Sequence, residues 1–355
     1  MRKTAVALLY AFFFQSANLT DVDRLIDRGH WKQARAILVE RVRKNPADAR
    51  AAYLLSQVQI AFGDLNSALK LAENVVRLEK ENADYHALLS RVYGEMAQSA
   101  GALRRMMYGL RFRNEAEAAL RLNARHIDAR YELMLFYLNA PAAMGGKPKA
   151  RAFAQEIVSV NAWEGYMAHA RLAQEENDWA NVEAFYLKAV AIAPAEYDSQ
   201  AALAEFYASD SQKKFALAEK HARIALSEDN GQSRAYAVLA SVFALQQRLP
   251  ELDDVLSQAE KNIPDDFVPY YASGRALLSS GGDPRRAERH LRKYLTQEPE
   301  GNTPGHAKAH WQLALALERQ GQKTEAIAEL RIAVRLDPDL DEASRDLRRL
   351  TSARP

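Results

Sequence analysis

The chain has 355 residues, with 48 Lys and Arg against 46 Asp and Glu, which gives a formal net charge of +2. Hydrophobic residues make up 48% and charged residues 26%, a composition that excludes an intrinsically disordered chain. The balanced charge gives no indication of nucleic acid as a partner, and the lack of cysteine excludes disulfide scaffolds, thiol nucleophiles and cysteine-ligated zinc.

The first 17 residues have the layout of a secretory signal peptide. Arg2 and Lys3 precede an apolar run over residues 4–14, and the small residues Ser16 and Ala17 follow it. The run is shorter than the roughly 20 apolar residues that span a bilayer. We therefore expect residues 1–17 to direct export to the periplasm. The alternative is a first helix that packs onto the rest of the chain, which would leave the protein in the cytoplasm.

From residue 18 onward, one pattern of small and apolar residues returns along the chain. Its clearest copy consists of Leu313, Ala314, Leu317, Gly321, Ala326, Leu330, Ala333 and Pro338. Pro194, Pro264 and Pro299 close earlier copies, at intervals of 70 and 35 residues. The steps of three and four residues within each copy indicate two amphipathic helices. Because one such pair cannot bury its own apolar face, neighbouring pairs must stack on one another.

This pattern resembles the tetratricopeptide repeat (TPR) family, and the resemblance implies an all-α, right-handed superhelical solenoid. We expect the solenoid over residues 18–340, in about nine repeats that begin near residues 18, 49, 83, 127, 163, 197, 233, 267 and 307. Residues 341–355 place Leu347 and Leu350 among charged side chains. They predict a C-terminal capping helix with a polar face.

An extension over about residues 97–113 lengthens the third repeat. It contains Arg104, Arg105, Arg111 and Arg113 and no acidic residue, interleaved with Met, Tyr, Leu and Phe. A basic amphipathic stretch is typical of a surface that contacts anionic lipid or a partner helix. The alternative is a long helix whose arginine stems cover a neighbouring repeat. Residues 101–113 are therefore the segment through which we expect any membrane contact.

Residues 139–149 predict a long turn inside the fourth repeat. The sequence Gly145-Gly146-Lys147 invites comparison with a phosphate-binding loop. The pattern G-x4-G-K-[ST] fails, however, because Pro141 stands at the first glycine position and Pro148 follows the lysine. The P-x3-GG spacing is similar to a turn of uncharacterised exported bacterial TPR proteins. That similarity favours export.

The sequence contains no pattern typical of a catalytic or metal centre. His306 and His310 lie one helical turn apart, but no acidic residue stands between them and no third ligand is evident. The glycine and serine motifs of dinucleotide-binding proteins and hydrolases are also missing. We therefore expect no enzyme activity, no cofactor and no metal.

The TPR resemblance implies that positions 2, 5 and 9 of each repeat face a concave groove. Chaperone-binding TPR proteins place Lys and Asn at positions 5 and 9 to clamp a terminal carboxylate, whereas the third repeat has Ala87 and Arg91 there. Aromatic and cationic residues, which are enriched at binding hot spots, occupy several of these positions instead. The predicted partner-binding groove consists of Arg91, Tyr131, Tyr271, Arg275, Lys308 and Trp311. The alternative is that some of these rings fill gaps between repeats.

These observations predict a non-catalytic scaffold that binds a peptide or protein partner in its groove, in the cell envelope. The alternative is an accessory subunit of a transport or secretion system that contacts the membrane through residues 101–113. No nucleic acid partner is expected. The sequence gives no indication of the oligomeric state.

Overall fold

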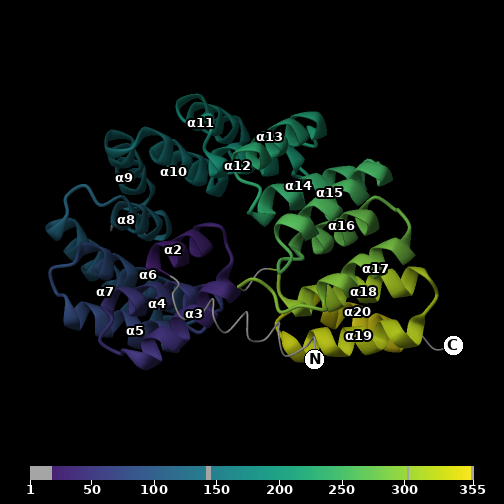
Figure 1. Cartoon of the computed structure of the whole chain (residues 1–355), viewed down its shortest axis with the longest axis horizontal. Helices are drawn as coiled ribbons and strands as arrows, with labels where there is room; N and C mark the ends of the chain where they lie inside the picture. Colours follow the sequence, from purple (N-terminus) through teal and green to yellow (C-terminus); the bar gives the residue numbers. More distant parts are fainter. Residues whose placement is uncertain (1–17, 141–144, 302–303, 353–355) are drawn as a thin grey trace. The chain divides into compact units, whose positions relative to one another are not determined.

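The computed structural model describes residues 18–140, 145–301 and 304–352, and every regular element in these ranges is an α-helix (Figure 1). The leader over residues 1–17 and Pro141 of the P-x3-GG turn lie outside the described residues. The helices form two compact units, one up to Ile192 and one from Ala193 onward. They are called the N-terminal and C-terminal units below.

The N-terminal unit contains, in its described part, five consecutive helix pairs. They are α2 (Leu19–Asp27) with α3 (Trp31–Lys44), α4 (Ala49–Ala61) with α5 (Leu65–Leu78), α6 (Ala83–Gln98) with α7 (Ala102–Leu122), α8 (Ile127–Asn139) with α9 (Gly146–Val160), and α10 (Ala162–Glu175) with α11 (Trp179–Ile192). In Figure 1 the first helices α4, α6, α8 and α10 lie inside the second helices of their pairs.

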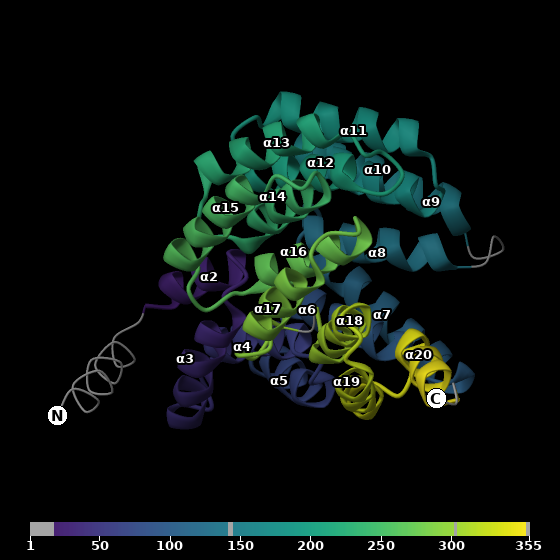
Figure 2. The same cartoon turned by 90° about the vertical axis from the view of Figure 1, so that its right-hand side faces the viewer.

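The C-terminal unit continues the arrangement with four pairs and a terminal helix. They are α12 (Tyr197–Ala208) with α13 (Phe215–Glu228), α14 (Ser233–Leu245) with α15 (Leu249–Asn262), α16 (Val268–Ser279) with α17 (Pro284–Tyr294), α18 (His306–Arg319) with α19 (Lys323–Leu336), and α20 (Asp341–Ser352). Figure 2 shows α18, α19 and α20 side by side. The first helix of every described pair begins within one residue of its predicted start. The predicted all-α solenoid of about nine pairs with a capping helix is confirmed.

Short polar and glycine signals set where the helices begin and end. The Asp48 side chain accepts a hydrogen bond from the Ala51 backbone N–H at 3.0 Å and so caps the start of α4. Between the helices of the second pair, Gly63 has a φ of 72°, and the Asp64 N–H bonds back to the Gln59 carbonyl at 2.9 Å. This left-handed turn closes α4, because glycine has no Cβ to oppose a positive φ.

Small residues allow the helices of the solenoid to cross closely. Ala68, Ala326 and Ala333 are fully buried, as the repeat pattern requires at helix crossings. The closest approach is at Gly165 of α10, where an added Cβ would lie 2.3 Å from the Val158 backbone nitrogen of α9. Bulk at these positions would therefore force the helices apart.

A single residue joins α9 to α10. The Asn161 N–H bonds to the Ile157 carbonyl at 2.8 Å, while the Asn161 carbonyl accepts the Gly165 N–H at 3.0 Å. Asn161 therefore ends one helix and begins the next.

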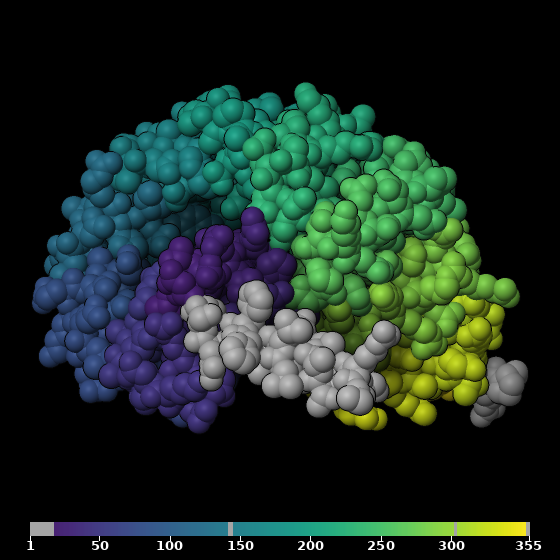
Figure 3. Space-filling model, in the orientation of Figure 1, coloured from purple at the N-terminus to yellow at the C-terminus, as the bar shows by residue number. Residues whose placement is uncertain are grey.

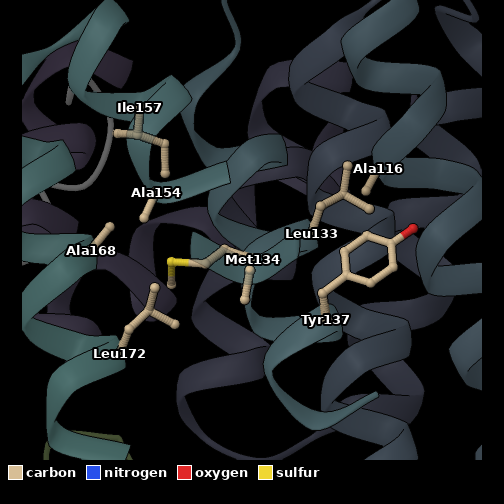
Figure 4. Packing of buried hydrophobic residues seen from close by; sticks show 9 residues of the cluster. Ala116, Leu133, Met134, Tyr137, Ala154, Ile157, Ala168 and Leu172 are labelled. Carbon is tan, nitrogen blue, oxygen red and sulfur yellow. The ribbon is translucent and has the colours of Figure 1, made fainter. Parts of the chain in front are cut away.

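One apolar core of the N-terminal unit shows how successive pairs share buried side chains (Figure 4). Leu133 and Met134 of α8 are at most 2% exposed. Ile157 of α9 and Leu172 of α10 belong to the same cluster. Ala116 of α7 is buried in the same cluster, so four helices from three repeats complete one core, which is why a single pair would not be stable alone.

Two segments depart from the regular repeat. The expected extension over residues 97–113 is an elongation of the second helix, since α7 has 21 residues whereas α5 and α19 have 14 each. In the expected turn over residues 139–149, α9 already begins at Gly146. Pro148 is tolerated there because the first turn of a helix needs no N–H donor from that residue. None of the helices in the described ranges is long and apolar enough to cross a bilayer.

Candidate functional site

The first helices of neighbouring pairs contact one another directly, α4 with α6 and α6 with α8. Side chains on their free faces therefore line the inner face of the N-terminal unit. Figure 3 shows this unit hollowed between its purple helices and its blue to teal helices. The candidate site consists of the side chains that these inner helices bring together.

Arg91 belongs to α6, the inner helix that contacts both α4 and α8. Its side chain is exposed, and it makes no hydrogen bond or ion pair with any residue that the structure describes. Two other arginines near the inner face are already paired. Arg50 bonds to Asp23 at 2.7 Å and Arg171 bonds to Glu175 at 2.6 Å. Arg91 thus differs from these neighbours in having a free guanidinium group.

Tyr53 of α4 forms one side of the surroundings of Arg91. The pKa of the Tyr53 phenol is raised to about 12, mainly by burial; the carboxylates of Asp84 and Asp128 contribute to the rise, and the charges of Arg50 and Arg91 oppose it. The Tyr53 ring also packs against the ring of Tyr85, with 5.3 Å between centroids. The Tyr53 ring is therefore half-buried and fixed by packing, and it lies close enough to Arg91 for the charge of the guanidinium to affect its pKa.

Tyr131 of α8 forms the other side. Burial raises the pKa of its phenol, and the charges of Arg171 and Arg91 lower it while Glu132 raises it. Burial also raises the pKa of the Glu132 carboxyl group to about 7, and Arg91 is the main charge that opposes this. The predicted groove residues Arg91 and Tyr131 are thus brought together by the fold.

In the C-terminal unit, Tyr271 and Arg275 of α16 form a second aromatic and cationic pair. The Tyr271 ring is half-buried against Tyr294 of α17, with 5.4 Å between centroids. Burial raises the pKa of the Tyr271 phenol and the charge of Arg275 lowers it. Arg275 is exposed, and it has no hydrogen-bond or ion-pair partner in the described part of the chain.

The predicted groove residue Trp311 has a structural contact that its repeat position does not reveal. Its indole N–H donates a hydrogen bond to Asp346 of α20 at 2.9 Å. The ring is half-buried and links α18 to the capping helix. Lys308, one turn before it, is exposed.

Other inner positions of the C-terminal unit are occupied by contacts within the chain. Arg234 of α14 makes two hydrogen bonds to the carboxylate of Glu205 on α12, at 2.7 and 2.6 Å. The Tyr197 hydroxyl accepts the Ala235 backbone N–H at 3.0 Å. These contacts fix α12 against α14.

Sequence reasoning missed two members of the N-terminal site. Tyr53 had a usable signal, because it occupies position 5 of the second repeat, as Tyr131 does in the fourth. Glu132 had no such signal in the sequence. An acidic residue beside a groove position is expected on a solvated helix face, and only the structure shows the burial of its carboxyl group.

The histidine pair of the last repeat is accounted for by hydrogen bonds. The Nε2 atom of His306 lies 2.8 Å from the Gln297 carbonyl oxygen, and the Nδ1 atom of His310 lies 2.6 Å from Glu329. Each imidazole therefore has a protein partner that explains its position.

Comparison with known families identifies the repeat. Two family models, each described as tetratricopeptide repeat, match residues 25–92 and 271–341. The chain is a tetratricopeptide repeat protein. The matched residues of this TPR protein extend from α2 into α6 and from α16 to the start of α20. No curated protein matches the chain.

Three solved structures are similar to this chain. Yeast Tom70 is 12% identical and superposes with a TM-score of 0.50, over 96% of this chain and 88% of that chain. The thermophilic TPR protein TTC0263 from Thermus thermophilus is 24% identical over 52% of this chain and 94% of its own, with a TM-score of 0.46. A tetratricopeptide repeat protein from Parabacteroides merdae is 15% identical over 86% of this chain and 99% of its own, with a TM-score of 0.44. The likeness to Tom70 shows the solenoid fold.

Proposed function

We propose that this TPR protein is a non-catalytic scaffold that binds an extended protein segment on the inner face of its N-terminal unit. The TPR repeats support a protein-interaction scaffold as the general function. The observation that carries the specific proposal is the free guanidinium of Arg91 within electrostatic reach of both Tyr53 and Tyr131.

The chemistry of this face favours a segment with an acidic residue next to an apolar one. A carboxylate on the partner would accept two hydrogen bonds from the planar guanidinium of Arg91. An apolar neighbour would pack against the rings of Tyr53 and Tyr131, which lose little conformational freedom on binding because they are already half-buried. Glu132, with a pKa raised to about 7, would repel an incoming carboxylate less when protonated.

Peptide selection tests which residues the inner face prefers. Random twelve-residue peptides are selected on the full-length protein, and the dissociation constants of the selected peptides are measured by fluorescence anisotropy. We expect acidic residues flanked by apolar ones to be enriched. The Arg91→Gln variant should bind these peptides at least tenfold more weakly.

A matched variant controls for the loss of one positive charge. Arg121 is an exposed arginine on the second helix α7 and has no partner among the described residues. Arg121→Gln should leave the affinity unchanged. Equal affinities of the Arg91→Gln variant and the wild type would show that the inner face around Arg91 is not the binding site.

The proposed location of this scaffold is the cell envelope. The support comes from the leader-like residues 1–17 and the similarity of the P-x3-GG turn to exported proteins. N-terminal sequencing of the protein purified from its native host tests the location. We expect the mature chain to start near Asn18, and an intact Met1 on protein from the cytoplasmic fraction would refute export.

An accessory subunit of a transport or secretion system remains the second candidate. One observation favours it, namely the exposed apolar side chains on α7 within residues 101–113. A role of this kind requires contact between that segment and a membrane.

A further inference from the structure

The N-terminal half of α7 exposes an unusual amount of apolar surface. Leu103 is 77% exposed, Met106 62%, Leu110 46% and Met107 40%. Leu103 and Met106 are the two most exposed large apolar side chains in the part of the chain that the structure describes. Because the four residues are spaced at three and four positions, they form one stripe along the helix.

This stripe, called the α7 ridge below, is a feature of one helix. The open surface around it is lined by residues of α7 alone, namely Leu103, Arg104, Met106, Met107, Leu110, Arg111 and Asn114. The opposite face of α7 packs on α6, where the Tyr108 ring stacks on that of Tyr93 with 6.2 Å between centroids. The ridge is therefore a convex apolar surface on a helix that is held firmly from behind.

The charged residues that α7 itself places beside the ridge are all positive. The sequence has no acidic residue between Glu95 and Glu115. Arg104 is exposed, and it forms no hydrogen bond or ion pair with a described residue. Arg111 lies beside the ridge with its guanidinium 5.5 Å from the centre of the Tyr93 ring.

We propose that the α7 ridge docks the protein on the surface of an anionic lipid bilayer. The leucine and methionine side chains would enter the boundary between headgroups and acyl chains, while Arg104 and Arg111 would meet lipid phosphates at the same depth. A bilayer accepts a convex apolar ridge without needing a matching groove. A second copy of this chain fits poorly, because it would place arginines against arginines around the contact.

The exposed apolar residues elsewhere in the described chain do not share these properties. Ile192 and Leu336 are 51% and 54% exposed, and each is a single residue at the end of a second helix. Isolated apolar side chains of this kind are normal on protein surfaces. They supply matched controls for the α7 ridge.

Vesicle flotation of the full chain tests the proposal. The vesicles contain phosphatidylcholine alone or with about 30 mol% phosphatidylserine, a level that gives a negative surface potential. We expect the wild type to float with the anionic vesicles and to be released by added salt. The Leu103→Gln/Leu110→Gln variant should partition at least about tenfold more weakly, and Arg104→Gln about fivefold more weakly.

The controls separate the ridge from other apolar parts of the chain and from the peptide site. Leu336→Gln and Arg335→Gln change an apolar and a charged surface residue of α19 and should leave flotation unchanged. The apolar run at residues 4–14 is the same in all variants, so it does not contribute to the differences. Arg91→Gln should float like the wild type, which distinguishes this proposal from the one for the inner face.

Three results would overturn the proposal. The first is equal flotation of the ridge variants and the wild type, with circular dichroism showing that all are folded. The second is equal binding to neutral and anionic vesicles. The third is no flotation of the wild type together with loss of a protein partner in the ridge variants, which would identify the α7 ridge as a protein-docking surface.

Discussion

The inner faces of the two units use similar residues in different ways. In the N-terminal unit Arg91 has no partner among described residues and lies near two half-buried tyrosines. In the C-terminal unit, Arg234 is bound to Glu205 and Trp311 donates to Asp346 of the capping helix. Inner positions of the repeat thus make contacts within the chain at Arg234 and Trp311, whereas Arg91 and Arg275, at the ninth position of their repeats, have no hydrogen-bond or ion-pair partner among the described residues. A residue's place in the repeat determines the direction of its side chain, while its neighbours determine whether it is free to bind.

Removing Trp311 should give the largest effect on stability. Trp311→Ala removes a half-buried ring and leaves Asp346 without its donor, so we expect the free energy of unfolding of the C-terminal unit to fall by about 2–4 kcal/mol. Trp179→Ala is the control, since Trp179 is 39% exposed and should cost less than about 1 kcal/mol. Urea denaturation measures the stability of both variants, and hydrogen exchange locates the effect in α18 and α20 for Trp311→Ala and in α11 for Trp179→Ala. If Trp311→Ala leaves the stability unchanged and weakens partner binding, Trp311 is a partner-binding residue of the groove instead.

Neutralising an arginine in each unit should separate binding from folding. Arg91→Gln should weaken peptide binding by about 1.5–2 kcal/mol with little change in thermal stability. Arg234→Gln should do the reverse and lower stability by about 1 kcal/mol, because it breaks an exposed but bidentate pair with Glu205. Anisotropy titrations and calorimetric melting of both variants give the comparison. If both variants changed peptide affinity and thermal stability in the same way, the proposed difference between the units would be wrong.

Mild acid should destabilise the C-terminal unit through His290 of α17. Burial lowers the pKa of its imidazole to about 4, with the charge of Arg286 adding to the effect, and its Nδ1 atom lies 2.8 Å from the Ser273 hydroxyl oxygen. Because the unfolded imidazole has a pKa near 6.5, stability is present above that pH and is lost as the pH falls toward 4. We expect a contribution of roughly 2 kcal/mol to be lost by pH 5, measured as faster hydrogen exchange in α17. The His290→Gln variant should show a smaller decrease between pH 7 and pH 5.

The N-terminal unit should show the opposite dependence through Glu132. Its carboxyl pKa is raised by burial to about 7 from 4.5, so the folded state favours the protonated form. Stability from this group is present at low pH and is lost as the pH rises through 7. Glu132→Gln should therefore raise the free energy of unfolding by about 1 kcal/mol at pH 8 and have no such effect at pH 4. Urea titrations at the two pH values test this, and an equal gain at both would assign the effect to packing.

The sequence predicts the helix pairs of this protein well, because the signals that form them are local. The alternation of three- and four-residue steps with residues such as Gly63 and Ala333 places each first helix to within one residue. The TPR resemblance implies that Arg91 and Tyr131 share one face. Local sequence patterns do not predict contacts between segments that are distant in the sequence. The bond from Trp311 to Asp346 depends on how α20 docks, and the raised pKa of Glu132 depends on its burial.

The sequence shows that the segments 97–113 and 139–149 differ from the regular repeat, but it does not show which structure they adopt. The run of arginines and apolar residues over 97–113 marks an unusual segment. Whether its leucines and methionines face a neighbour or the solvent is decided by the packing of α7 on α6. Similarly, Gly145 and Gly146 indicate a break after α8, yet α9 starts three residues before the end of the predicted turn.

The one-residue joint at Asn161 has a practical consequence for anyone who wishes to shorten or divide this chain. A truncation at that point would expose the end of α9 and remove the backbone partner of Gly165. An insertion there would separate two helices that approach so closely that Gly165 has no room for a Cβ. Fragments and tagged versions of the protein should therefore keep the fourth and fifth helix pairs together and place their boundaries elsewhere.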